Sequence, residues 1–249
     1  MAGHSKWASI KHKKKAVDAK RGALFTKLTR AITVAARDGG DPEANPTLAL
    51  AVQKARDASM PKDNIERAIA KGTGADSDAD AFESVLYEGY GPGGVAILVE
   101  ALSDNRNRTG SEVRHVFTKH GGSLGEPGSV AWTFEKKGEI VVDGSRYAED
   151  DILAAIDAGA EDVALDGDVW EIVTGPTDVA AVRDALAAEG VEIESAELLQ
   201  RPTTRTPVDE DRVRTLMNLI EALEEHDDVQ AVHANFDVDA DVLERVAAA

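Results

Sequence analysis

The chain has 249 residues and contains no cysteine. Disulfide bonds, thiolate metal sites and cysteine nucleophiles are therefore excluded. No apolar run approaches the ~20 residues that a membrane-spanning helix needs. The N-terminal segment is basic but lacks the apolar core of a secretory signal. We therefore expect a cytoplasmic protein with no membrane partner.

Sequence patterns of enzyme chemistry are also missing. The chain has 46 acidic residues, so neighbouring carboxylates such as Asp150–Asp151, Glu224–Glu225 and Asp227–Asp228 arise by chance and do not indicate acid–base catalysis. His115 and His120 lie five apart on one predicted helix, a spacing that does not suit shared metal coordination. There is no GxSxG, and the turn after residue 90 lacks the GxGxxG spacing. We expect no enzymatic activity, metal, cofactor or small-molecule substrate.

Positive charge is concentrated in the first 37 residues, which we call the basic segment. It holds ten Lys or Arg residues against one acid, Asp18, and so carries +9. The whole chain carries −18, so the remainder carries −27. Net charge governs association and solubility rather than fold. A concentrated cation joined to an acidic body suits a polyanionic partner, and nucleic acid is the obvious one.

The basic segment also contains an aromatic ring among its cations. Trp7 is close in sequence to His4 and His12, and an indole beside lysines can stack on an unpaired base. Blocks of like charge are often only solvated tails; Trp7, Ile10 and the helix that follows count against that alternative. The candidate nucleic-acid-binding residues here are Lys6, Trp7, Lys11, His12, Lys13, Lys14, Lys15, Lys20, Arg21, Lys27 and Arg30.

Three helices are predicted before residue 72. The first, over 16–38, has one apolar face and a neighbouring stripe of cations. The second begins at Asn45-Pro46, a cap followed by proline at the first helical position. The third follows Met60-Pro61, and Gly72 is predicted to stop it. The small, acidic segment 72–81 is typical of a linker.

The pattern then changes to short strands and helices. Strands 84–90 and 95–102 are predicted to form a hairpin through a Gly-Pro-Gly-Gly turn. A helix follows from Thr109, whose TGSE sequence is a capping box. A further strand is predicted over 128–134.

The order of elements from Glu139 to Leu199 is β-α-β-β-α-β, which is that of a ferredoxin-like split βαβ fold. After a linker over 201–207, one helix (209–226) and one strand (229–235) close the chain. Because they have no partner of their own, we expect them to complete the unit that begins at residue 82.

The predicted fold class is α+β and multidomain: an N-terminal three-helix domain with a basic arm, plus two α/β domains of ferredoxin-like type, one inserted in the other. The predicted domains are residues 1–75, a discontinuous α/β domain of 80–134 with 206–238, and an inserted βαββαβ domain of 135–205.

A second candidate contact lies in the loop Asp104–Arg108. Asn105, Arg106 and Arg108 offer an amide and two guanidinium groups for contact with phosphate or RNA on an otherwise acidic domain. A solvated loop before a helix is the alternative interpretation.

Several long motifs resemble the YebC family. They are GHSKWxxIKHKKxxxDxxRG at the start, MPxDNIERAIxKGxG, YEGYGPGGVAxxVExLxDNxNRT, GGxLGxxGSVxWxF and the LMNLIEALEEHDDVQxVxxN tail. The matches run from end to end, and the N-terminal motif departs only by an extra lysine in Lys13–Lys15. The resemblance implies a helical domain plus two α/β domains and a non-enzymatic regulator of gene expression.

Two functions stay open. Members of the family are commonly described as DNA-binding transcriptional regulators. Others, including the mitochondrial translational activator of cytochrome oxidase, act in translation at the ribosome. For DNA, the third helix offers Asn64 and Arg67 as base-reading side chains. For RNA, Trp7 among lysines suits an irregular, partly single-stranded target. The expected partner is thus DNA or ribosomal RNA, with the ribosome itself as a further candidate.

Overall fold

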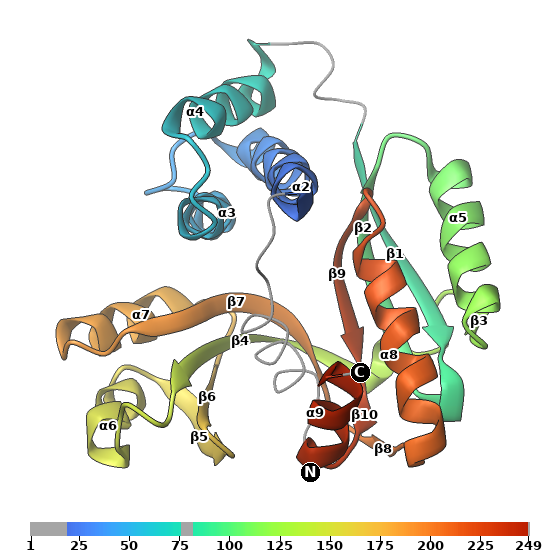
Figure 1. Cartoon of the computed structure of the whole chain (residues 1–249). Coiled ribbons are helices and arrows are strands. Elements are labelled where there is room, and N and C mark those ends of the chain that lie inside the picture. The colour runs from blue at the N-terminus through green and yellow to red at the C-terminus, as the bar shows by residue number, and fades with distance from the viewer. Residues whose placement is uncertain (1–18, 76–81, 249) are drawn as a thin grey trace.

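The computed structural model describes residues 19–75 and 82–248, which form a helical domain and two α/β domains, one inserted in the other (Figure 1). Within these residues, none of the helices has the length and apolar character needed to cross a bilayer. The fold class predicted from the sequence is confirmed. The predicted domain boundaries remain a prediction.

The helical domain consists of α2 (Ala19–Ala35), α3 (Pro46–Asp57) and α4 (Lys62–Ala70). Apolar side chains from all three form its core, and among them Ile32, Leu48 and Ala55 are completely buried. Asn45 joins two of the helices. Its side-chain oxygen accepts a hydrogen bond from Leu48 N at 3.1 Å, while its amide nitrogen donates to the carbonyl oxygens of Ala35 and Gly39.

The end of the third helix differs from the prediction. Gly72 does not stop it, because a wider helical turn continues over Lys71–Ala75 and ends where Gly74 takes φ of 95°. A Cβ on Gly72 would lie 2.3 Å from the Thr33 carbonyl oxygen. The glycine at 72 therefore serves close packing against α2, and Gly74 provides the left-handed residue that ends the turn.

The second domain is built on a four-stranded sheet of order β3-β1-β2-β9. All neighbouring strands in it are antiparallel. Helices α5 and α8 pack on one face and share a continuous apolar core with the sheet (Figure 1). The elements are β1 (Glu83–Tyr90), β2 (Ala96–Ser103), α5 (Arg106–Lys119), β3 (Ser123–Leu124), α8 (Glu210–Glu224) and β9 (Val229–Ala234).

Helix α5 begins earlier than predicted. Its cap is Asn105, whose side chain accepts a hydrogen bond from Arg108 N at 3.1 Å, and not Thr109. Thr109 is instead completely buried in the first turns of the helix. Arg106 and Arg108 are consequently helical residues rather than loop residues.

The inserted domain has a fully antiparallel sheet of order β5-β6-β4-β7, with α6 and α7 packed on its core. If these four strands are numbered 1 to 4 in the order in which they occur in the chain, their order across the sheet is 4-1-3-2, as in the ferredoxin-like fold. The elements are β4 (Phe134–Asp143), α6 (Glu149–Asp157), β5 (Ala160–Asp166), β6 (Val169–Thr174), α7 (Val179–Ala188) and β7 (Ile193–Pro202).

Strands β4 and β7 extend beyond the inserted domain as a two-stranded ribbon (Figure 1). Phe134, at the start of β4, packs in an apolar cluster with Ala96 and Leu98 of the second domain, whereas Ile140 lies in the core of the inserted domain. The residues Arg201–Pro202, predicted as linker, pair with β4 at the end of β7. The two α/β domains are thus joined by a hydrogen-bonded ladder and not by a loose linker.

Residues 128–133 form a loop with a short 3-10 turn (Ala131–Thr133), so of the predicted strand 128–134 only Phe134 is in a strand, at the start of β4. The reason is Glu88 of β1. Its carboxylate accepts hydrogen bonds from the backbone N–H groups of Gly128, Val130 and Ala131 at 2.6–2.7 Å. The loop wraps around this buried carboxylate instead of adding an edge strand.

The structure contains C-terminal elements that the sequence patterns did not predict. Short strands β8 (Thr206–Pro207) and β10 (Phe236–Asp237) pair in parallel, and α9 (Ala240–Ala248) follows. Leu243 of α9 is completely buried in the core of the second domain.

We predict that Glu88→Gln destabilises the protein by about 2 kcal/mol, because an amide cannot accept all three N–H groups and presents its own donors to them. Burial alone would raise the pKa of Glu88, but the three backbone hydrogen bonds outweigh it and lower the pKa. The stabilisation is therefore present above the unfolded-state pKa of about 4.3 and is lost as the pH falls through the lower folded value.

Denaturant unfolding across pH checks this prediction. Glu126→Gln, an exposed change in the same loop, is the matched control and should unfold like the wild type. A Glu88→Gln protein as stable as the control at pH 7 would contradict the role of this carboxylate.

Candidate nucleic-acid interface and the Asp228 ion-pair cluster

The candidate residues of the basic segment fall into two groups. Lys6, Trp7, Lys11, His12, Lys13, Lys14 and Lys15 lie outside the described residues, and their role stays a prediction. Lys20 and Arg21 belong to the first turn of α2. Lys27 and Arg30 lie further along the same helix, where their contacts are defined.

Lys27 and Arg30 reach the second domain. The Lys27 ammonium donates to the carbonyl oxygen of Glu224 at 2.6 Å, at the last residue of α8. Arg30 Nη1 donates to the carbonyl oxygen of Asp227 at 2.6 Å and to Oδ1 of Asp228 at 2.9 Å. Its guanidinium also lies over the ring of Phe82, 5.3 Å from the centroid. These cations hold the helical domain against the end of α8.

Asp228 is the centre of this contact and is 3% exposed. Its Oδ1 accepts from Arg30, while its Oδ2 accepts from Arg108 Nη2 at 2.8 Å and from the Thr109 hydroxyl at 2.6 Å. Its backbone carbonyl accepts from Leu102 N of β2 at 2.8 Å. One residue thus connects α2, α5 and the sheet.

The electrostatics of Asp228 follow from these contacts. Burial alone would raise its pKa, but the hydrogen bonds from Thr109 and Arg108 and the charges of Arg108 and Arg30 outweigh burial. The net effect holds the pKa of Asp228 below its usual range. The carboxylate is therefore charged at neutral pH and binds two guanidinium groups.

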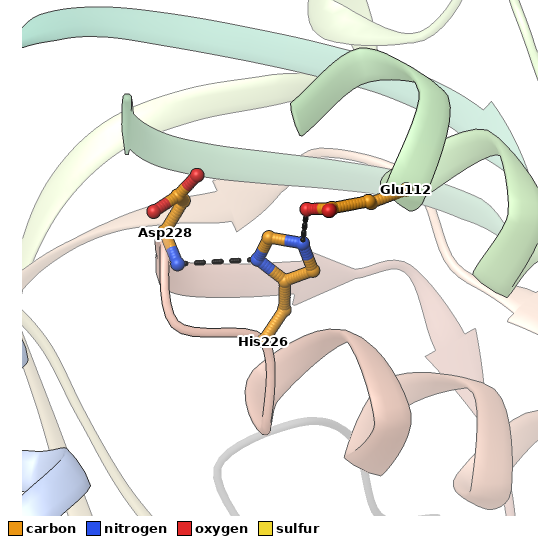
Figure 2. Close-up of side chains that lie close together, drawn as sticks. All are labelled: Glu112, His226 and Asp228. Atoms are coloured by element: carbon orange, nitrogen blue, oxygen red, sulfur yellow. Dashed lines mark hydrogen bonds and ion pairs between the residues drawn. The ribbon is translucent and has the colours of Figure 1, made fainter. Parts of the chain in front are cut away.

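His226 positions the turn that carries Asp228 (Figure 2). Its Nδ1 accepts the backbone N–H of Asp228 at 3.1 Å, and its Nε2 lies 2.9 Å from Oε2 of Glu112. Because Nδ1 is the acceptor, the ring proton of the neutral imidazole belongs on Nε2, from which it donates to Glu112.

Glu112, His226 and Asp228 bring ligand atoms within 4.8 Å of one another, as a metal site would. The existing bonds do not favour that use. Both imidazole nitrogens are engaged, and Asp228 already faces two guanidinium groups that would repel a divalent cation. The chemistry of the cluster is that of an ion-pair hub.

An open groove of about 750 Å³ lies beside this hub. Arg30, Arg108 and His115 line it together with five acids, namely Asp104, Glu112, Glu225, Asp227 and Asp228. This mixture of charges does not form a positive surface. The groove is therefore a poor site for a phosphate backbone while Lys27 and Arg30 hold the helical domain against the end of α8, which we call the docked arrangement.

The candidates at the start of α5 separate in the structure. Arg108 is engaged by Asp104 and Asp228, each at 2.8 Å. Arg106 is exposed and lies 3.7 Å from Glu83. Asn105 is occupied as the helix cap through its side-chain oxygen. Of the two arginines, Arg106 has the more exposed guanidinium.

Sequence reasoning missed Asp228 and His226. In the sequence, Asp227–Asp228 is one of several neighbouring pairs of acids, and no spacing pattern includes His226. No local pattern distinguishes Asp228, because its partners are 120 and 198 residues away in the chain. The pairing of β2 with β9 places Asp228 beside the start of α5, and the contact of α2 with this turn adds Arg30.

The comparisons with known proteins agree with this architecture. A helical domain and two linked α/β domains define a multidomain α+β protein. Residues 5–75 match the TACO1/YebC protein N-terminal domain, and residues 82–236 match the TACO1/YebC second and third domain. The chain belongs to the TACO1/YebC family.

Relatives match along the whole length. A "Probable transcriptional regulatory protein" of Rubrobacter xylanophilus is 57% identical over 249 residues, covering 99% of this chain and 100% of the relative. One of the same name from Acidothermus cellulolyticus is 55% identical, with coverage of 99% and 100%. The crystal structure of a conserved hypothetical protein from Aquifex aeolicus is similar with a TM-score of 0.81 and 49% identity, covering 90% of this chain and 93% of that one.

We predict that Asp228→Asn destabilises the protein by about 2 kcal/mol, because two guanidinium groups lose a buried counter-charge. Since its folded pKa is lowered, the wild-type advantage is full above the unfolded-state pKa of about 3.9 and disappears as the pH falls through the folded value. Thermal and denaturant unfolding at pH 7 and in acid measure it.

Asp227→Asn is the matched control, because Asp227 is exposed and contacts Arg30 through its backbone carbonyl. Equal stability losses in the two variants would show that the effect is one of net charge and not of the buried contacts of Asp228.

Proposed function

We propose that this protein is a non-enzymatic, nucleic-acid-binding regulator of gene expression that binds through its basic segment. The observation that carries the proposal is the distribution of charge: +9 over residues 1–37 against −27 over the rest. The relatives named "Probable transcriptional regulatory protein" support the same class of function.

The structure of the acidic body strengthens the argument from charge. Several of its cations are paired with acids, including Arg108 with Asp228, Lys137 with Glu161 and Arg146 with Glu192. Such pairs have little free charge to offer phosphates. The unbalanced cations of the first 22 residues are therefore the favoured contact, and the body keeps other surfaces away from the polyanion.

A DNA-reading helix receives little support from α4. Arg67, one of its two candidate base-reading residues, donates to the side chain of the other, Asn64, and to the carbonyl oxygen of Asp63. Phosphate contacts position a protein without specifying sequence. We therefore propose that contacts with the phosphate backbone of the nucleic acid dominate binding. DNA is the first candidate target. Structured RNA is the second, in which case the protein would be a ribosome-associated translation factor.

We predict that replacing Lys13, Lys14 and Lys15 by Ala weakens binding and its salt dependence. If about five cations of the basic segment meet phosphates, log affinity should fall against log salt with a slope of roughly −4.5 for duplex or −3.5 for single strands. The triple variant should flatten this slope by about two to three units. Fluorescence anisotropy with duplex DNA, an RNA hairpin and purified ribosomes, each across salt, measures the slopes and ranks the targets.

The matched control removes three exposed lysines of the body and helical domain, Lys62, Lys119 and Lys136. It has the same net charge as the triple variant. Equal losses in both would reduce the effect to net charge, and wild-type binding by the Lys13–Lys15 variant would leave the basic segment as a solvated tail.

Trp7→Ala separates stacking from charge. If the indole stacks on a base, the change costs about 1–3 kcal/mol of binding with the salt slope nearly unchanged. If Trp7 instead packs on the helical domain, the substitution lowers the melting temperature. Parallel binding and melting measurements on this variant distinguish the two roles.

A further inference from the structure

The contact between α2 and the end of α8 uses cations that are also candidates for phosphate binding. Lys27 and Arg30 donate to the carbonyl oxygens of Glu224 and Asp227, and Arg30 to the carboxylate of Asp228. These bonds occupy both side chains in the docked arrangement. A phosphate that takes the N–H groups engaged on Lys27 Nζ and Arg30 Nη1 must replace these acceptors.

The docking contact is polar, so its loss exposes little apolar surface. Among the described residues, the apolar core of the helical domain shares no member with the core under α5 and α8. Leu50 of α3 packs against the inserted domain, and Lys54 forms a 2.8 Å ion pair with Glu197 there. Polar interfaces of this kind between domains permit relative motion.

Opening leaves no buried charge unpaired. Asp228 would keep the hydrogen bonds from Arg108 and Thr109 when Arg30 departs. The carbonyl oxygens of Glu224 and Asp227 would return to water, since they lie at or just beyond the C-terminal end of α8, where carbonyl groups have no helical partner. Arg30, whose side chain is 21% exposed, would exchange the carboxylate of Asp228 for a phosphate and so would keep an anionic partner.

Docking and phosphate binding exclude one another electrostatically. The docking turn reads Glu224-Glu225-His226-Asp227-Asp228, so four acids lie where Lys27 and Arg30 are held. A phosphate bound to these cations in the docked state would approach several carboxylates of like charge. A phosphate therefore binds Lys27 and Arg30 better when they have left the acidic turn, and its binding favours separation of the helical domain from the end of α8.

We propose that the contact of Lys27 and Arg30 with the Glu224–Asp228 turn is a latch that a phosphate-bearing polyanion opens by competition. The nucleic acid bound by the basic segment extends its contact along α2 to Lys27 and Arg30, and the helical domain leaves the second domain. The latch rests on the proposed function for the identity of its natural ligand, but the competition itself requires only a polyanion.

Thermodynamic linkage predicts how a change in docking alters the affinity for a polyanion. If docking competes with binding, a change that weakens docking must tighten binding. Asp228→Asn should raise affinity at least about fivefold, the lower range of typical coupling. Asp227→Asn makes the same change of charge one residue away, where only the backbone carbonyl contacts Arg30, and should give a smaller gain.

The distance between the domains can be measured directly. The chain contains no cysteine, so Glu66→Cys on α4 and Thr118→Cys on α5, both exposed positions, create a unique pair for fluorescence energy transfer in the full chain. The probes are inorganic polyphosphate, duplex DNA and an RNA hairpin. We expect transfer efficiency to change on saturation with each probe that binds, and Arg30→Gln to show the changed value without any probe.

Arg146→Gln is the control for the loss of an arginine, because Arg146 pairs with Glu192 inside the inserted domain; it should keep the wild-type transfer. If Asp228→Asn does not fold, the wild-type and Arg30→Gln distances still decide the question. A nucleic acid that binds without changing the distance overturns the latch and leaves the proposed function intact. Failure of DNA, RNA and ribosomes to bind, with polyphosphate still opening the contact, overturns the proposed function alone. No change of distance with saturating polyphosphate also overturns the latch.

Discussion

The arrangement of the domains depends on the buried carboxylate of Asp228. The carboxylate accepts hydrogen bonds from Arg30 of α2 and from Arg108 and Thr109 of α5, and the backbone carbonyl of the same residue accepts from Leu102 of β2. A buried charge without partners would be costly, whereas two guanidinium groups and a hydroxyl compensate for its desolvation. The same bonds that satisfy Asp228 therefore fix the start of α5 and the position of α2.

The two α/β domains are joined in a different way. Strands β4 and β7 pair from Phe134–Pro202 at one end to Val142–Ile193 at the other, with one register shift, and the two ends pack in the cores of different domains. The inserted domain is thus tied by backbone hydrogen bonds, which do not respond to competing anions. The helical domain is tied mainly by side-chain charges, which do. This contrast places the movable joint at α2 and not at the ribbon.

Much of the fold could be predicted because it is encoded locally. The Asn45-Pro46 cap, the apolar periodicity of α2 and the βαββαβ order all act within short stretches of chain. Two errors arose where a distant residue decides the structure: Glu88 turns residues 128–133 into a loop, and Thr33 explains the glycine at 72. The third error is local, because Asn105 takes the cap that the TGSE motif favoured. The candidate site followed the same rule: clusters of lysine are visible in sequence, whereas the long-range partners of Asp228 are not.

The contacts of Lys27 and Arg30 change the meaning of the basic stripe on α2. The sequence places these cations on one helical face, which suits a phosphate backbone, and the structure places them on an acidic turn. The two observations are compatible, because an acidic turn and a nucleic acid present the same kind of ligand to the same donors. An internal anion that occupies a cationic surface lowers affinity for weak, non-specific polyanions more than for a ligand that also engages the first 22 residues. The docked state would then act as a threshold for binding, and charge complementarity within the chain would add to its selectivity.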